Sequence, residues 1–241
     1  MKLKVISTGS EANGYILQPS ADGSAAIAIE AGCGWKEAAM AMDFDTSRLR
    51  ALFISHEHGD HARKVSQWVK AGMQVVCSEG TAEKIGLKAP GVWYTRIKAG
   101  GGTVKVGDWL AVAFNTVHDA SEPVGFLFRH PEKKVLFLTD SGRIRLVTNN
   151  VNCFIVECNW TFAELSAGSD PPSLKRRIME THTGLETLKE FFKVQGMAKA
   201  EKIVLIHASA RNCDIDRAVR EIEAQTGIPT YAAHKGDTFN F

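Results

Sequence analysis

The run His-Glu-His-Gly-Asp-His at residues 56–61 constrains this chain most, because it gathers metal-type side chains directly after a hydrophobic segment. Leu49 to Ser55 is a nearly continuous apolar run and predicts a buried strand. The potential ligands in the run are His56, His58, Asp60 and His61. Glu57 is expected to point away from them. A solvated histidine-rich loop is the alternative, and so many ligands at these spacings after a strand disfavour it.

The spacing within the run predicts two metal sites. Alternate residues of an extended chain face the same way, so His56 and His58 can share one ion. The turn that follows directs Asp60 and His61 toward a second ion. Gly59 is expected to let the backbone turn sharply between the two pairs.

Composition limits the class of protein. The chain has 241 residues, of which 44% are hydrophobic and 23% charged, as expected for one globular domain over residues 1–241. A net charge of +2 provides no strongly basic field, so nucleic acid would need a local patch. The five cysteines are scattered and form no C-x-x-C pair, which argues against a disulfide framework and favours a cytoplasmic location. No stretch approaches the ~18 apolar residues of a membrane span.

The hydrophobic pattern alternates between strands and helices and leaves no long linker. Strands are predicted at Leu3 to Ser7, Gly14 to Gln18, Ala25 to Glu30, Leu49 to Ser55, Gln74 to Cys77, Thr103 to Val106, Leu110 to Thr116, Gly125 to Arg129, Val135 to Thr139, Cys153 to Glu157 and Lys202 to Ile206. Helices are predicted at Trp35 to Phe44, Ala62 to Ala71, Thr81 to Ile85, Leu174 to Glu180, Leu185 to Val194 and Asp214 to about Gln225. Two β-rich halves, each followed by helices, suggest an α/β four-layered αββα sandwich in a single domain.

Polar residues at the ends of later strands complete the pattern. His118 follows one predicted strand, and Asp140 follows another in the segment VLFLTDSG. A surface turn is the alternative for both residues. Thr183 and Glu186 have the spacing of a capping box, which predicts a helix start directly after His182.

His-x-His-x-Asp-His after a hydrophobic strand resembles the signature of the metallo-β-lactamase fold superfamily. His207, in KIVLIHASARN, resembles the final ligand motif of that superfamily. The resemblance implies one ion on His56, His58 and His118, a second on Asp60, His61 and His207, and Asp140 and a hydroxide bridging them. Two zinc ions are expected, although manganese or iron also suit nitrogen and oxygen ligands. Such a pair activates water for hydrolysis.

The resemblance also narrows the bond that is cleaved. Classical β-lactamases usually have Cys where Asp140 stands, so the glyoxalase and phosphodiesterase branches are favoured. Thr-His-Thr-Gly around His182 is similar to the Gly-His-Leu-Ser/Thr segment of ribonuclease Z-like nucleases, with Thr181 replacing the Gly. That His contacts the scissile phosphate or protonates the leaving oxygen; a surface histidine is the alternative. VECNW resembles a Glu-x-Asn-His segment, with Trp160 in place of the His.

Residues near the last ligand are candidates for substrate binding. Lys175, Arg176 and Arg177 could match the charge of phosphates, although a solvated helix face explains them nearly as well. Three adjacent residues cannot all face one ligand, so we expect one or two to bind. Ser209 and Asn212 could donate hydrogen bonds to substrate or close a turn.

The resemblance, which is strongest to the single-domain bacterial nucleases of this fold, implies a two-metal hydrolase that cleaves phosphodiester bonds, in DNA or RNA, with Asp60 and His182 as catalytic residues. Asn13 and Glu30 match positions that shape the floor of such sites. The intervals between the motifs are too short for a tRNA-gripping arm. A cyclic-nucleotide phosphodiesterase and a glyoxalase II-like thiolester or lactone hydrolase are the alternatives. We expect no membrane partner, and a homodimer is left open.

Overall fold

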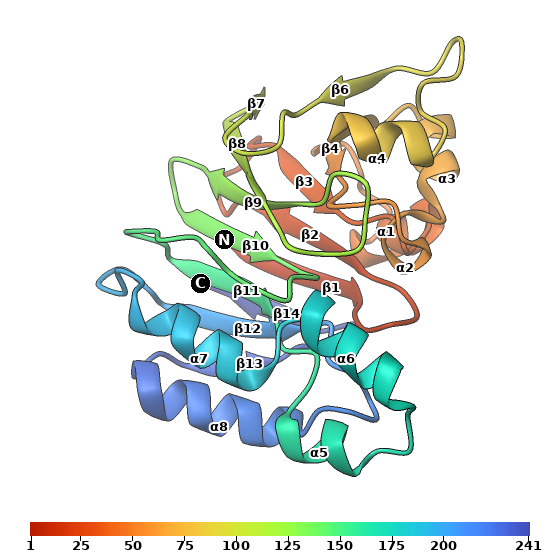
Figure 1. Cartoon of the computed structure of the whole chain (residues 1–241). Coiled ribbons are helices and arrows are strands. Elements are labelled where there is room, and N and C mark those ends of the chain that lie inside the picture. The colour runs from red at the N-terminus through yellow and green to blue at the C-terminus, as the bar shows by residue number, and fades with distance from the viewer. The chain divides into compact units, whose positions relative to one another are not determined.

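The computed structural model describes residues 1–241, and the chain forms two compact units (Figure 1). The N-terminal unit contains Met1–Asn115, Ala120–Glu132 and His234–Phe241. The C-terminal unit contains Thr116–Asp119 and Lys133–Ala233. The interpretation of residues 1–241 as one hydrolase domain stays a prediction.

The N-terminal unit is built on a seven-stranded sheet with the order β14-β1-β2-β3-β4-β5-β6. Its strands are β1 (Lys2–Ser7), β2 (Gly14–Gln18), β3 (Ala26–Ile29), β4 (Leu49–Phe53), β5 (Gln74–Cys77), β6 (Tyr94–Arg96) and β14 (Thr238–Asn240). The strands from β3 to β6 are parallel. Their carboxyl ends therefore share one edge of the sheet, and the chain that leaves β4 there carries the His-Glu-His-Gly-Asp-His run.

Each face of this sheet is covered. Figure 1 shows helices on one side of it. They are α1 (Trp35–Ala41), α2 (Gly59–Ala62), α3 (Val65–Lys70) and α4 (Glu79–Lys84). On this side, Trp68 is fully buried and donates its indole hydrogen to the Cys33 carbonyl at 3.0 Å.

The other face of the sheet packs against an antiparallel ladder of β7 (Thr103–Val106), β8 (Trp109–Asn115) and β9 (Val124–Arg129). The ring of Phe53 lies 5.5 Å from that of Phe126 and 5.0 Å from that of Phe128, between centroids. The N-terminal unit therefore has one helical layer and two β layers.

The C-terminal unit contains four parallel strands in the order β13-β12-β11-β10. They are β10 (Lys134–Leu138), β11 (Cys153–Glu157), β12 (Lys202–Ile206) and β13 (Thr230–Ala232). The helices are α5 (Phe162–Ala167), α6 (Pro172–Thr181), α7 (Leu185–Lys193) and α8 (Ile215–Thr226). Phe154 of β11 packs against Phe191 and Phe192 of α7, which fixes that helix on the sheet. Each unit thus combines strands and helices, as expected for an α/β fold.

Most of the predicted strands are present within a residue or two. The short strands β6, β13 and β14 and the short helix α5 were not predicted, because three to six residues give too little periodicity. The helix predicted from Ala62 to Ala71 is wrong as a single element. The chain is interrupted between α2 and α3, where the Lys64 amide donates to the Ala31 carbonyl at 2.9 Å instead of joining a helical ladder.

Two local predictions are wrong. Gly184, and not Thr183, is the N-cap of α7, and the Thr183 hydroxyl donates to the Ser141 carbonyl at 2.7 Å, so there is no capping box. Gly59 has no positive φ, and a Cβ added there would meet no heavy atom within 4 Å, so the turn does not require glycine.

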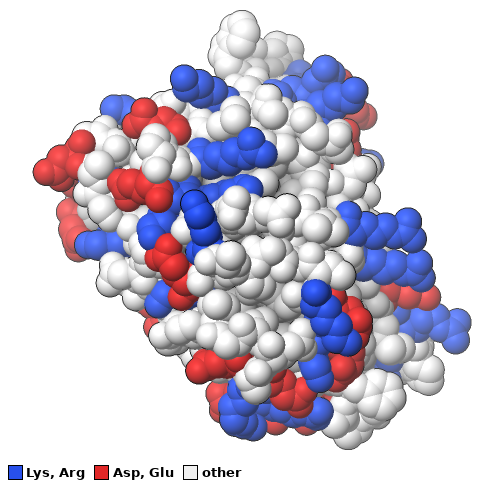
Figure 2. All heavy atoms as spheres, turned by 90° about the vertical axis from the view of Figure 1, so that its left-hand side faces the viewer, with Lys and Arg blue, Asp and Glu red and all other residues white.

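The surface carries mixed charge, as the small net charge predicts. On the face drawn in Figure 2, basic and acidic side chains lie interspersed. No helix has the length and apolar composition needed to cross a membrane.

Candidate metal centre

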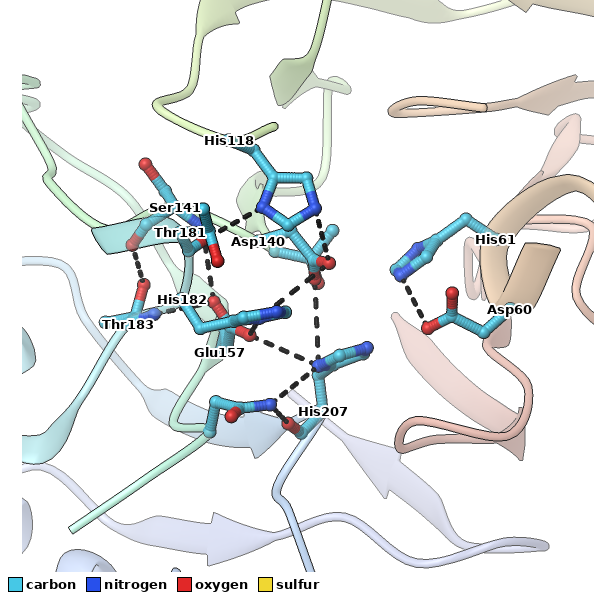
Figure 3. Close-up of polar contacts among 12 residues, drawn as sticks. Asp60, His61, His118, Asp140, Ser141, Glu157, Thr181, His182, Thr183 and His207 are labelled. Atoms are coloured by element: carbon cyan, nitrogen blue, oxygen red, sulfur yellow. Dashed lines mark hydrogen bonds and ion pairs between the residues drawn. The ribbon is translucent and has the colours of Figure 1, made fainter. Parts of the chain in front are cut away.

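The predicted ligands of the N-terminal unit gather at the carboxyl end of β4. The ring of His56 lies 4.7 Å from that of His58 and 4.3 Å from that of His61, between centroids. Oδ2 of Asp60 lies 3.0 Å from Nε2 of His61, so these two atoms face one point (Figure 3). His56 and His61 are at most 1% exposed. We call His56, His58, Asp60 and His61 the metal loop.

Buried polar groups hold the metal loop from behind. Nδ2 of Asn13 donates to Oδ2 of Asp60 at 3.2 Å and lies 3.4 Å from Nε2 of His61. The backbone N–H of Asn13 also donates to the backbone carbonyl of Asp60 at 2.8 Å. Glu30 is fully buried, with Oε2 at 3.6 Å from Nδ1 of His61. Glu57 accepts a hydrogen bond from the Ser121 amide at 2.7 Å and so belongs to loop packing.

The C-terminal unit brings a second set of predicted residues together where its parallel strands end. Asp140 follows β10 and His207 follows β12, and Oδ1 of Asp140 lies 3.7 Å from Nδ1 of His207 (Figure 3). Both residues are 2% exposed. The Thr139 hydroxyl donates to Oδ1 of Asp140 at 2.6 Å, which fixes the carboxylate.

Three residues that follow strands share a strained backbone. Glu30 has a φ of 67°, Asp140 of 48° and His207 of 54°. Left-handed conformations of residues other than glycine cost of order 1–3 kcal/mol and cluster at functional sites. Their occurrence just after buried strands, in each unit taken by itself, supports a functional role for these strand ends.

Glu157, at the end of β11, lies beside Asp140 and His207 and was not predicted from the sequence. It is fully buried, and Oε1 lies 2.8 Å from Nδ1 of His182 and 3.2 Å from Nδ1 of His207. Oε2 accepts from the Thr183 amide at 2.9 Å and the Ser141 amide at 3.3 Å. Two signals were available in the sequence, namely its place at the end of a buried strand and its match to the Glu of the Glu-x-Asn-His segment, to which no role was assigned. We call Asp140, Glu157, His182 and His207 the strand-end cluster.

His182 lies inside the strand-end cluster and is not a surface residue. Its ring is stacked on that of His207 at 5.7 Å between centroids, and its side chain is 17% exposed. Burial opposes the charged ring, but the attraction and hydrogen bond of Glu157 are stronger together and raise the pKa of His182. Because Glu157 contacts Nδ1, the imidazole presents Nε2 as its second polar atom.

The residues around His182 fix its backbone. Trp160 donates its indole hydrogen to the His182 carbonyl at 3.1 Å. A Cβ at Gly184 would lie 2.5 Å from the Trp160 ring, so the glycine allows the close packing of that ring. The tryptophan that replaces the histidine of the resembled segment thus supports the loop carrying His182.

His118 is held in one orientation. Its Nδ1 lies 2.7 Å from the Thr181 carbonyl at the end of α6, so the ring donates there and Nε2 is the nitrogen that could bind a metal ion (Figure 3). That atom lies 3.3 Å from Oδ2 of Asp140. Burial lowers the pKa of His118, outweighing the opposite effect of Asp140, and so favours the neutral ring that binds metals.

The residues predicted to bind substrate contact other parts of the chain and not the strand-end cluster. Lys175 donates to the Ser166 carbonyl at 2.7 Å, and Arg177 pairs with Asp119 at 2.7 Å. Arg176 is exposed. Oγ of Ser209 accepts from the Asn212 amide at 3.3 Å and closes a turn. The role of Lys175, Arg176, Ser209 and Asn212 in substrate binding stays a prediction.

The donor set fits a divalent metal ion. In the C-terminal unit, Asp140, Glu157, His182 and His207 each offer one ligand atom, and these atoms lie within 4.8 Å of one another. Imidazole nitrogens and carboxylate oxygens suit zinc, manganese and iron, and no cysteine takes part. The metal loop adds two pairs of predicted ligands, His56 with His58 and Asp60 with His61.

Comparison with known proteins identifies the family. The family described as "Beta-lactamase superfamily domain" matches residues 27–208. The chain belongs to this superfamily. The prediction of an α/β metallo-β-lactamase fold is confirmed. The chain is 27% identical over 225 residues to exodeoxyribonuclease WalJ of Streptococcus pneumoniae, a match that covers 88% of this chain and 82% of the relative.

Solved structures share the fold along the whole chain. The metallo-beta-lactamase fold protein YhfI from Bacillus subtilis matches with a TM-score of 0.72 and 16% identity, covering 99% of each chain. The short form of human tRNase Z matches with a TM-score of 0.67 and 14% identity, covering 100% of this chain and 99% of that one. These likenesses extend the fold of the superfamily over residues outside the family match.

Proposed function

We propose that this chain is a metal-dependent phosphodiesterase that cleaves DNA, acting as one hydrolase domain over residues 1–241. The contact between Glu157 and His182 carries the proposal, because it holds an imidazole beside Asp140 and His207. Phosphodiester cleavage needs a proton for the leaving oxygen, and an imidazolium supplies one near neutral pH. Thiolester hydrolysis has less need of such a donor.

The ligands divide into two sets of three and one shared residue. His56, His58 and His118 are assigned to one ion, and Asp60, His61 and His207 to the other, with Asp140 between them. This division is the one implied by the resemblance of the ligand run, and it uses every predicted ligand. Two zinc ions are the expected occupants, and bound there they would lower the pKa of a coordinated water toward neutrality.

The chain's own residues then orient the reaction. Asn13 fixes the Asp60 carboxylate, and Asn159 lies 3.2 Å from Nδ1 of His207 through its side-chain nitrogen. Glu157 holds His182 by Nδ1, which leaves Nε2 to contact the scissile phosphate or to give its proton to the leaving oxygen. Glu157 is a positioning residue in this scheme, and His182 is the catalytic acid.

DNA is the preferred substrate because the relative WalJ is named an exodeoxyribonuclease and aligns with most of this chain. The similarity to an exodeoxyribonuclease also favours removal of nucleotides from the end of a DNA strand. RNA, a cyclic nucleotide and a thiolester are the alternative substrates, and one set of parallel assays distinguishes them from DNA. A cytoplasmic location suits such an enzyme.

The test uses purified protein loaded with zinc or manganese. It is assayed on single-stranded DNA, RNA, a cyclic nucleotide and a thiolester under identical conditions. We expect DNA to be cleaved at the highest kcat/KM, with mononucleotides among the products. Thiolester turnover without any phosphodiester turnover would overturn the proposal. A His182→Ala variant that keeps its metal and loses most of its rate on DNA would support the role of the acid.

A further inference from the structure

A cavity of about 570 Å³ lies within the N-terminal unit, between β1, α1 and the turn before β14. Its walls include the apolar side chains of Val5, Ile6, Ala12 and Ala41. Pockets for small organic ligands have volumes of roughly 300–1,000 Å³ and are lined mainly by apolar groups with a few polar ones. The cavity therefore has the size and the walls to hold an organic molecule.

Three basic side chains line the same cavity. Arg63 and Lys64 come from the chain just after the metal loop, and Lys235 comes from the turn before β14. None of the three forms an ion pair within the protein. The charges of Arg63 and Lys235 both lower the pKa of the Cys33 thiol in the wall, although burial raises it overall. Glu11 and Glu37 are the acidic residues of the lining, so positive charge is in excess.

The chemistry of the lining selects the ligand. Unpaired guanidinium and ammonium groups bind phosphate through charge-assisted hydrogen bonds. An apolar wall beside them accommodates a flat, weakly polar group such as a nucleobase. A nucleoside monophosphate combines both features and is small enough for the cavity. A bare phosphate would leave the apolar wall uncovered, and a nucleoside would leave the cations unmatched.

The backbone of the cavity wall is bonded to the metal loop. The Ala31 amide donates to the His61 carbonyl at 2.6 Å, and the Lys64 amide donates to the Ala31 carbonyl at 2.9 Å. A Cβ on Gly32 would lie 1.9 Å from the Asp60 carbonyl oxygen, so this segment packs directly on the loop. A ligand that orders Arg63 and Lys64 therefore acts on the chain that carries Asp60 and His61.

We propose that this cavity is a regulatory site for a nucleoside monophosphate, the product of the proposed nuclease reaction, with its phosphate on Arg63, Lys64 and Lys235. The inference rests on the proposed function for the source of the ligand. Occupancy of the site restrains the metal loop and slows DNA cleavage as product accumulates. It is distinct from competition at the metal centre, because its lining contains none of the proposed metal ligands.

Binding is measured by calorimetry with dAMP on the full chain after metal removal, so that the phosphate cannot bind at the metal centre. We expect one saturable site, with deoxyadenosine and inorganic phosphate each binding at least tenfold more weakly. The double variant Arg63→Ala/Lys235→Ala is expected to lose at least tenfold in affinity, and Ala41→Phe should fill the cavity. The matched control Lys36→Ala/Lys70→Ala removes two exposed lysines of neighbouring helices outside the cavity and should bind as the wild type does.

The location is tested with His182→Ala/His207→Ala, which should bind dAMP normally. The proposal would be overturned if the wild type bound no dAMP, or if both cavity variants bound dAMP as well as the wild type does. Loss of binding in this histidine variant would also overturn it. A protein that binds dAMP in the cavity but cleaves no phosphodiester would refute the proposed function alone. In an active protein, Arg63→Ala/Lys235→Ala should retain its initial rate on DNA and lose inhibition by added dAMP.

Discussion

Replacing Glu157 with glutamine tests how the strand-end cluster is held together, because the two side chains have the same shape. The carboxylate lies within hydrogen-bonding distance of His182, His207, and the amides of Ser141 and Thr183. Glutamine has one accepting oxygen, so in either orientation its NH₂ group faces donors. Hydrogen bonds to charged groups contribute about 1.5–3 kcal/mol each, and removal of the charge offsets part of the loss. We expect Glu157→Gln to lower the free energy of unfolding by about 2–4 kcal/mol.

The same substitution should change catalysis through His182. Without the carboxylate, burial dominates and the pKa of His182 falls, so less of the ring is protonated at neutral pH. The alkaline limb of the pH–rate profile should move to lower pH, and kcat should fall by about 10²-fold, within the range of acid–base catalysis. Urea unfolding, NMR titration of the histidine and single-turnover DNA cleavage measure the three effects.

The matched control is Glu186→Gln, which changes an exposed glutamate on α7 and should alter stability by less than about 0.5 kcal/mol. Glu157→Gln could instead keep the stability, the His182 titration and the cleavage rate of the wild type. Glu157 would then not be the ionised acceptor at this site.

Other predictions concern the metal loop and the surface. Gly32→Ala, with its Cβ against the Asp60 carbonyl, should destabilise the protein by about 1–3 kcal/mol in urea unfolding. Gly59→Ala, inside the ligand run but in open space, should keep wild-type stability within about 0.5 kcal/mol, and a larger loss would show that the loop needs glycine there. Arg177→Ala removes an exposed pair with Asp119 and should cost under about 1 kcal/mol. A chelator should lower the Tm, because ions that bind only the folded state stabilise it, and added zinc should restore it.

The sequence predicted the strands that precede the candidate ligands, because each ligand motif follows a hydrophobic run long enough to be recognised as a strand. Leu49 to Ser55 predicted the strand before the metal loop, and Val135 to Thr139 predicted the strand before Asp140. The superfamily resemblance, which rested on the spacing of the ligand run, is confirmed by the family match. The left-handed backbone of Asp140 and His207 could not be predicted, since it depends on packing at the sheet edge.

The rest of the site depends on contacts that one sequence does not reveal. Glu157 had no ligand-like spacing, and only the parallel order of β10, β11 and β12 places it beside Asp140 and His207. Thr183 was assigned to a helix cap from its spacing to Glu186, but its hydroxyl is bonded to Ser141 instead. The interruption after α2 likewise results from a hydrogen bond to Ala31, far away in the sequence.

We propose that the metal loop and the strand-end cluster serve one metal-dependent phosphodiesterase reaction. The most direct measurement combines metal content with DNA cleavage for the wild type and for Asp140→Ala. We expect two metal ions per chain in the wild type, cleavage of single-stranded DNA, and loss of both metal and cleavage in the variant. A wild-type protein that holds its metal and leaves DNA intact, or a variant that cleaves DNA at the wild-type rate, would contradict it.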